Sequence, residues 1–407
     1  MSRGEYILAI DWNGDLDFSD TGEDVTSRTL KCEWKRGSDY ASQLVGKAVA
    51  GTLTATLNNE SADYSTFNTS SPLTGNLVPG RKVRLTGNDG STTRTLWTGF
   101  LDSIEPIPSA NGANLARLKA IGPLGYLNKF DVSTAMFASK KAGELIGEIL
   151  DAAGWSDDDR DLDDGIVEFP RFWCERTKTL KALRLVEETE TGLLEENAAG
   201  SIVYRDRHAR SKDARSTASQ ATYSDASGAA LAYSHISQID PLKFIYNELR
   251  AKLQLHDGVW ILGQSSLGVQ TELGGDASVL WTHPETGSNS PGISAGATKT
   301  FTAQYPSSGS ANTARAVDFW TDLTATTDYL ANDSADGTGT NRTANITVSL
   351  TKRAQSMDIA LANGHTGTVY MTKLQAQGHP VSANNEFEIS ASDATSQSTF
   401  GKRTYPH

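Results

Sequence analysis

The chain has 407 residues, a mass of 43.7 kDa and a formal net charge of −12. At roughly 100–200 residues per domain, this length predicts about two to four domains. The negative charge argues against tight non-specific nucleic-acid binding, which needs lysine and arginine against phosphates. The sequence has no run of about 18 apolar residues, which excludes a membrane-spanning helix. Residues 1–5 lack the apolar core of a signal peptide, so we expect a chain made in a cytoplasm.

The first 125 residues have the pattern of short β-strands. Leu53, Ala55 and Leu57 alternate with threonines, which gives a strand with one apolar face. Asp89-Gly90 lies between two apolar runs and predicts a hairpin turn. Several short strands with regular turns are typical of a small barrel or sandwich.

The apolar period changes to that of helices between residues 126 and 235. One predicted helix carries Leu145, Ile146, Ile149 and Leu150 on a single face and stops at Gly154. A second carries Leu180, Leu183, Leu185 and Val186 and ends near Gly192. Residues 201–207 then have the pattern of a strand, so this part of the chain predicts a small α/β domain.

β character returns at about residue 236. Leu249, Ala251, Leu253 and Leu255 alternate with polar residues, which predicts a strand with an apolar face. Further strands are expected at 300–303, 345–350 and 369–371. The chain is therefore expected to be mainly β with a small α/β insertion.

An acidic loop near the N-terminus is the candidate metal site. Its oxygen ligands would be Asp11, Asn13, Asp15 and Asp17, which alternate along the chain as the ligands of calcium loops do. The sixth and twelfth positions of the loop are Leu16 and Gly22, where an EF-hand has glycine and glutamate. A polar turn loop without metal is the alternative, because Asp and Asn favour such turns by themselves. No other cofactor is expected.

Five carboxylates follow the second predicted helix: Glu187, Glu188, Glu190, Glu195 and Glu196. Paired carboxylates serve as general acid and base in some enzymes, but these have the pattern of a solvated helix face. The sequence also lacks a nucleophile-elbow serine motif, a phosphate-binding loop and histidines at metal-site spacing. We therefore expect no enzymatic activity.

Three further residue groups have two interpretations each. The basic group either contacts phosphate or acidic neighbours, or it is a solvated strand edge or loop. Its residues are Arg205, Arg207, His208, Arg210, Lys212 and Arg215. Trp260, Trp281 and Trp320 belong to a β core or subunit interface, or else to a glycan-binding face. The two cysteines, Cys32 and Cys174, are far apart and are expected to be buried free thiols rather than a disulfide or zinc site.

A series of segments resembles the baseplate hub or tail-tip structural proteins of tailed bacteriophages and prophages. In chain order the segments are 10–18 (IDWNGDLDF), 22–26 (GEDVT), 33–37 (EWKRG), 51–59 (GTLTATLNN), 71–81 (SPLTGNLVPGR), 97–102 (WTGFLD), 188–192 (ETETG), 201–207 (SIVYRDR) and 400–403 (FGKR). Each segment is short, and the resemblance lies in their order over most of the chain.

The resemblance implies a specific domain plan. Two tail-tube-like β-barrel domains, at 1–125 and 236–407, would flank an α/β domain at 126–235. The stretch 270–380 departs from the family pattern and is expected to form a β-sandwich-like insertion in the second barrel.

The resemblance also implies a structural role in the virion. Three copies would form a ring at the tail tip or baseplate that joins the sixfold tail tube to the threefold tip and encloses the DNA channel. The partners would be the chain itself, a tail-tube or distal tail protein, tip, spike or fibre proteins and the tape-measure protein, while DNA passes without specific binding. The alternatives are a receptor- or glycan-binding adsorption module and a cell-wall hydrolase, although the sequence carries no hydrolase signature.

Overall fold

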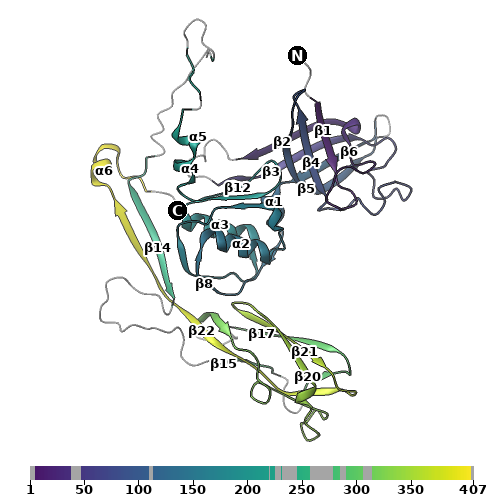
Figure 1. Ribbon diagram of the computed structural model, residues 1–407, viewed down its shortest axis with the longest axis vertical. Helices are drawn as coiled ribbons and strands as arrows, with labels where there is room; N and C mark the ends of the chain where they lie inside the picture. The colour runs from purple at the N-terminus through teal and green to yellow at the C-terminus, as the bar shows by residue number, and fades with distance from the viewer. Residues whose placement is uncertain are drawn as a thin grey trace. The chain divides into compact units, whose positions relative to one another are not determined.

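The protein is mainly β and divides into two compact units (Figure 1). The computed structural model describes residues 5–37, 47–109, 113–219, 221–224, 231, 245–256, 278–284, 290–305 and 314–404. The first unit is made of Met1–Val132, Ser139–Phe169 and Arg176–Ala232, and the second of Ser133–Ala138, Pro170–Glu175 and Tyr233–His407. Among the described residues, no helix is both long enough and apolar enough to cross a membrane.

A six-stranded antiparallel sheet dominates the first unit, in the order β1-β4-β5-β6-β3-β2. Its strands are β1 (Glu5–Ile10), β2 (Thr29–Gly37), β3 (Val49–Asn58), β4 (Lys82–Asn88), β5 (Thr93–Ile107) and β6 (Leu115–Ile121). The sheet curls into a half-barrel, and the rings of Tyr6 on β1 and Trp34 on β2 lie 6.2 Å apart between centroids. The predicted β character of this region is confirmed.

The core of the half-barrel follows the predicted alternation. Leu53, Ala55 and Leu57 on β3 are buried, as are Leu118 and Ala120 on the neighbouring β6. The predicted hairpin joins β4 to β5 through Asp89 and Gly90. Gly90 has a φ of +96°, which side chains disfavour. The apolar face of each strand therefore forms the core on the concave side of the half-barrel.

Small helices and strands make up the rest of the first unit. The helices are α1 (Pro123–Leu127), α2 (Ala142–Ala152), α3 (Thr179–Glu190), α4 (Ala209–Lys212) and α5 (Ala214–Thr217). The strands are β7 (Asp131–Val132), β8 (Phe137–Lys141), β9 (Arg160–Leu162), β10 (Glu168–Phe172), β11 (Thr177–Lys178), β12 (Leu193–Glu196) and β13 (Ile202–Arg205), with β8 and β10 shared between the units. Strand β13 pairs antiparallel to β12 and parallel to β9.

Both predicted helices exist, with one correction to the second. The predicted apolar face of α2 is buried, and Gly154 after it has the expected left-handed φ of +71°. In α3, however, Leu185 is 53% exposed because it points away from the face formed by Leu183 and Val186. The predicted end near Gly192 is confirmed, since α3 ends at Glu190 and Thr191 after it has a left-handed φ of +60°.

The second unit is built around one long strand, β22 (Val369–Ser392). The first part of β22 pairs with β15 (Ser278–Thr282), β16 (Gly292–Ile293), β18 (Ala314–Trp320) and β19 (Tyr329–Asn332). A second sheet consists of β17 (Thr298–Gln304), β21 (Ser356–Asn363) and β20 (Ile346–Lys352). The two sheets share one apolar core, which includes Phe301, Ile359, Met371 and Trp320, so they form a sandwich. The strands predicted at 300–303, 345–350 and 369–371 are confirmed.

A two-stranded ribbon extends from the same long strand. The end of β22 pairs antiparallel with β14 (Glu248–His256), and helix α6 (Ala394–Phe400) follows. Leu249, which was expected on an apolar face, is largely exposed at the start of β14. A second tube-like barrel over 236–407 stays a prediction, because 232–244 and 257–277 lie outside the described residues.

Candidate metal site and other predicted site residues

The acidic loop begins where β1 ends and then returns alongside it. Residues 23–25 run antiparallel to β1, with the Ile10 amide donating to the Glu23 carbonyl at 2.9 Å and the Val25 amide to the Leu8 carbonyl at 2.9 Å. This return pairing closes the loop and places Glu23 beside Asp11. The indole N–H of Trp12 donates to the Gly22 carbonyl at 3.2 Å and fixes the closed end.

Asp11 holds the first turn of the loop together. Its carboxylate is 1% exposed and accepts backbone N–H groups from Gly14 (2.5 Å) and Leu16 (3.1 Å). Gly14 has a φ of +83°, a conformation that favours glycine, and the flexible end of the Arg81 side chain lies beside it. Asp11 therefore has a structural role as well as a free lone pair on each oxygen.

Successive side-chain turns fill the middle of the loop. Each of Asn13, Asp15 and Asp17 accepts a hydrogen bond from the backbone N–H two residues later, at 3.1, 3.1 and 2.8 Å. This is the Asx-turn conformation that the polar-turn interpretation expected.

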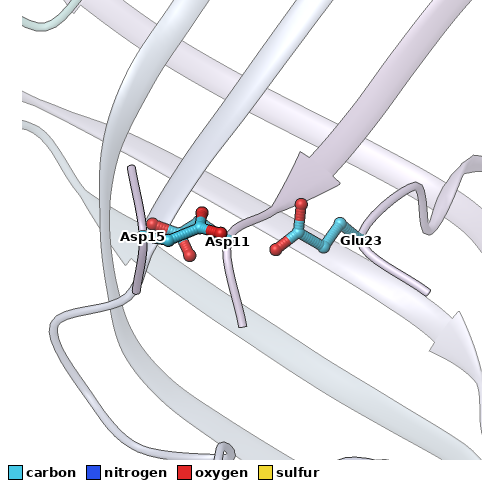
Figure 2. Close-up of side chains that lie close together, drawn as sticks. All are labelled: Asp11, Asp15 and Glu23. Carbon is cyan, nitrogen blue, oxygen red and sulfur yellow. The ribbon is translucent and has the colours of Figure 1, made fainter. Parts of the chain in front are cut away.

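Three carboxylates meet in this loop: Asp11, Asp15 and Glu23. One oxygen of each lies within 4.8 Å of one oxygen of the others, and Figure 2 shows the Glu23 carboxylate directed toward Asp11. Glu23 is 2% exposed, and burial is the main cause that raises its pKa, followed by the charges of Asp11 and Asp20. The loop thus concentrates negative charge around two buried carboxylates, Asp11 and Glu23, while Asp15 stays exposed to solvent.

The sequence predicted two of these three residues. Asp11 and Asp15 lie in the group, whereas Asn13 turns its amide N–H toward Asp15 (2.9 Å) and Asp20 (2.6 Å). Asp17 instead binds Ser19. Glu23 lies one position beyond the twelfth loop position that an EF-hand would use, so the spacing did not indicate it. Whether the loop binds calcium stays a prediction at this point.

The interpretation of the glutamates after α3 as a solvated face is wrong for Glu187, Glu190 and Glu196, all of which are buried. Glu187 accepts the Leu194 amide at 2.7 Å and pairs with Arg184 at 2.6 Å. Glu190 accepts the Val167 amide at 2.6 Å and pairs with Arg207 at 3.0 Å. Their charges are balanced by donors that the sequence pattern does not show.

Glu196 connects three elements of the first unit. Its Oε1 accepts the Gly51 amide of β3 at 2.6 Å, and its Oε2 accepts the Leu124 amide of α1 at 3.0 Å. Burial is the main cause that raises its pKa, while the two amides and the charges of Arg36 and Arg184 lower it. The carboxylate therefore joins the sheet, α1 and β12 at one point.

Gly122 leaves the room that this carboxylate occupies. A Cβ on Gly122 would lie 2.0 Å from Oε1 of Glu196, so we expect Gly122→Ala to lower the free energy of unfolding by about 1–3 kcal/mol. The matched control is Gly147→Ala in the interior of α2, where the nearest atom would be 3.9 Å away and alanine favours the helix. Urea denaturation followed by circular dichroism compares the two. Equal stability of both variants would contradict the close packing at Gly122.

The other predicted groups are mostly engaged within the fold. Arg205 pairs with Asp161 and Asp163, which supports a structural role for this part of the basic group. Trp320 is buried and donates to the Arg353 carbonyl at 2.8 Å, so the suggestion that it lines a glycan-binding face is wrong. Trp281 packs against the same core, and Trp260 lies outside the described residues.

Both cysteines are free thiols. Cys174 is buried as expected, whereas Cys32 is only half-buried on β2. Burial raises the pKa of both thiols, that of Cys32 to about 11. Neither thiol is therefore an activated nucleophile.

No protein-family model matches the sequence, and no curated protein matches it either. Among solved structures, the chain is similar to the 43 kDa tail protein of prophage MuSo2 from Shewanella oneidensis, with 14% identity over 50% of this chain and 53% of that one and a TM-score of 0.34. A tail protein from Neisseria meningitidis MC58 has 12% identity over 49% of this chain and 50% of that one, with a TM-score of 0.33. The match thus spans about half the length of these tail proteins.

A third similar structure is the half-lidded PdpA–VgrG complex from Francisella. It has 11% identity over 89% of this chain and 58% of that one, with a TM-score of 0.35. The structures that the chain resembles are therefore phage-type tail proteins and a VgrG-containing complex.

Proposed function

We propose that the chain is a non-enzymatic structural hub of a phage tail tip or baseplate. Three copies form a ring that joins the sixfold tail tube to the threefold tip and encloses the DNA channel. The order of the hub-like sequence segments supports this proposal, and the half-barrel sheet has the β architecture that a tube-like domain requires.

The observation that carries the proposal is the apolar surface at the edge of the half-barrel. Strand β2 pairs only with β3 among the described residues, and most of its nine residues are exposed. Leu30 and Trp34 on β2 and Val49 at the start of β3 are all exposed apolar side chains. An apolar edge strand left open invites aggregation, so a native protein covers it with a partner. In the proposed ring the partner is the next copy of the chain.

The net charge also suits a DNA conduit. Three copies carry −36, three times the −12 of one chain. Negative walls repel phosphates and let DNA pass without binding. The tail tube or distal tail protein, the tip, spike or fibre proteins and the tape-measure protein are the neighbours of such a ring.

Replacing Leu30 with glutamate is expected to break the ring without unfolding the chain. Leu30 is 63% exposed, so a charge there costs the single chain little, whereas burying that charge between copies weakens assembly by about tenfold or more. Phe67→Glu is the matched control, because Phe67 is 92% exposed and belongs to the loop between β3 and β4 rather than to the edge strand β2. Sedimentation velocity measures both variants, and an assembly that survives Leu30→Glu unchanged would contradict the role of this edge.

Electron microscopy of intact phage tails with a gold-labelled antibody against the chain tests the proposed location. We expect label at the end of the tail farthest from the capsid. Label along the shaft, or on the capsid, would contradict the hub proposal.

A further inference from the structure

We infer that Asp11, Asp15 and Glu23 bind a divalent cation of the calcium class. This ligand set differs from the one that the sequence pattern suggests, because it includes Glu23 and leaves out the Asp17 side chain. The inference concerns the loop itself and does not depend on the proposed hub function.

The protein balances the charges of the loop only in part, because the Arg81 guanidinium lies beside Gly14 of the loop but pairs with none of the three carboxylates. Three carboxylate oxygens lie within 4.8 Å of one another, and Asp20 adds a fourth negative charge near Glu23. Among the described residues, no lysine or arginine nitrogen lies within the 4.0 Å of an ion pair with Asp11, Asp15 or Glu23. Like charges at this separation repel strongly where water is excluded, so a bound positive charge would stabilise the closed loop.

One carboxylate oxygen is left free for such a ligand. Oε2 of Glu23 accepts the Asp20 amide at 3.1 Å, but the buried Oε1 has no hydrogen-bond partner. The nearest donor is the backbone N–H of Trp12, which interacts weakly with the Glu23 carboxylate but does not make a hydrogen bond of full geometry to Oε1. The side chain is 2% exposed and directed toward Asp11 (Figure 2). A buried oxygen without a donor is costly, and cation coordination removes that cost.

The donor atoms indicate which cation fits. The site offers carboxylate oxygens and contains neither histidine nor cysteine, which excludes the usual zinc ligands. Calcium takes six to eight oxygens in flexible geometry, and solvent at the exposed Asp15 can supply the ligands that the carboxylates do not. The Asx turns hold the loop in shape while leaving the second lone pair of each oxygen available.

Terbium luminescence of the full chain tests the site. Trp12 is buried in the same loop, so its excitation should sensitise bound Tb³⁺, and Ca²⁺ should displace the signal. We expect saturable luminescence whose affinity falls by about tenfold or more in Glu23→Gln, since the number of charged ligands sets the affinity of calcium sites. Asp17→Asn is the matched control, because asparagine keeps the oxygen that accepts the Ser19 amide, and we expect its affinity to stay within about twofold of the original.

A thermal melt separates cation binding from protonation of Glu23. Binding predicts that Ca²⁺ raises the melting temperature of the original chain and of Asp17→Asn but not of Glu23→Gln. Absence of saturable luminescence together with a melting temperature that neither Ca²⁺ nor chelator changes would overturn the inference. So would a Glu23→Gln variant that binds Tb³⁺ as well as the original chain.

Discussion

Glu196→Ala is expected to lower the free energy of unfolding of the first unit by about 3–5 kcal/mol. The change removes the acceptor for two buried amides, those of Gly51 and Leu124, and leaves a cavity between them. Each unpaired buried donor costs about 1–3 kcal/mol. Chemical denaturation followed by tryptophan fluorescence, to which the buried Trp97 of this unit contributes, measures the loss.

The neighbouring residue provides the control for this prediction. Glu195→Ala lies on the same strand, and its half-buried side chain makes no hydrogen bond within the described part of the chain. We expect it to change the stability by less than about 1 kcal/mol. Similar losses in the two variants would contradict the assignment of Glu196 as the connection between β3, α1 and β12.

The same residue gives a pH dependence of known sign. Burial raises the pKa of Glu196 above its value in the unfolded chain, so the folded state binds this proton more tightly. Its contribution is fully present below the unfolded pKa and is lost as the pH rises through the folded pKa. The free energy of unfolding of the original chain, relative to that of Glu196→Gln, should therefore be higher near pH 4 than at pH 7. Chemical denaturation of both proteins at both pH values tests this.

Asp318→Ala is expected to lower the free energy of unfolding of the second unit by about 3–5 kcal/mol, because it leaves the buried arginine that pairs with Asp318 without a negative partner. The Arg171 side chain is 4% exposed, and its Nη1 lies 2.5 Å from Asp318 and 3.1 Å from the sulfur of Met136. Arg171 comes from the short segment Pro170–Glu175, which belongs to this unit. Differential scanning calorimetry of the full chain resolves the effect on this unit.

Two further variants distinguish the loss of the ion pair itself from the cost of leaving a buried charge unpaired. The double change Arg171→Met and Asp318→Leu replaces both charges and should restore most of the stability. Asp322→Ala removes an exposed partner of Lys352 (2.7 Å) and should cost less than about 1 kcal/mol. A double variant as unstable as Asp318→Ala would contradict the explanation by an unpaired buried charge.

The sequence predicted those parts of the fold that depend on one apolar face. Leu53, Ala55 and Leu57 alternate with polar residues, and the apolar residues of α2 recur once per turn. Burial of this one face is enough to identify β3 as a strand and α2 as a helix. Leu185 was placed wrongly because it directly precedes the buried Val186 in α3, and adjacency in the sequence does not fix the helix face.

The parts that sequence reasoning missed depend on partners distant along the chain. A glutamate such as Glu196 is usually exposed to solvent. It can be buried here because the amides of Gly51 and Leu124 donate to it, and no local sequence pattern reveals these partners. Glu23 reaches the acidic loop because residues 23–25 pair with β1, not because of its spacing from Asp11. Long-range backbone pairing is thus what completes both sites.

The mass of the purified full chain in solution, measured by mass photometry, tests the central claim most directly. The hub proposal predicts a threefold species of about 131 kDa, three times the 43.7 kDa of one chain. A species that stays at 43.7 kDa at every concentration, and that also fails to assemble on the ends of purified tail tubes, would contradict it.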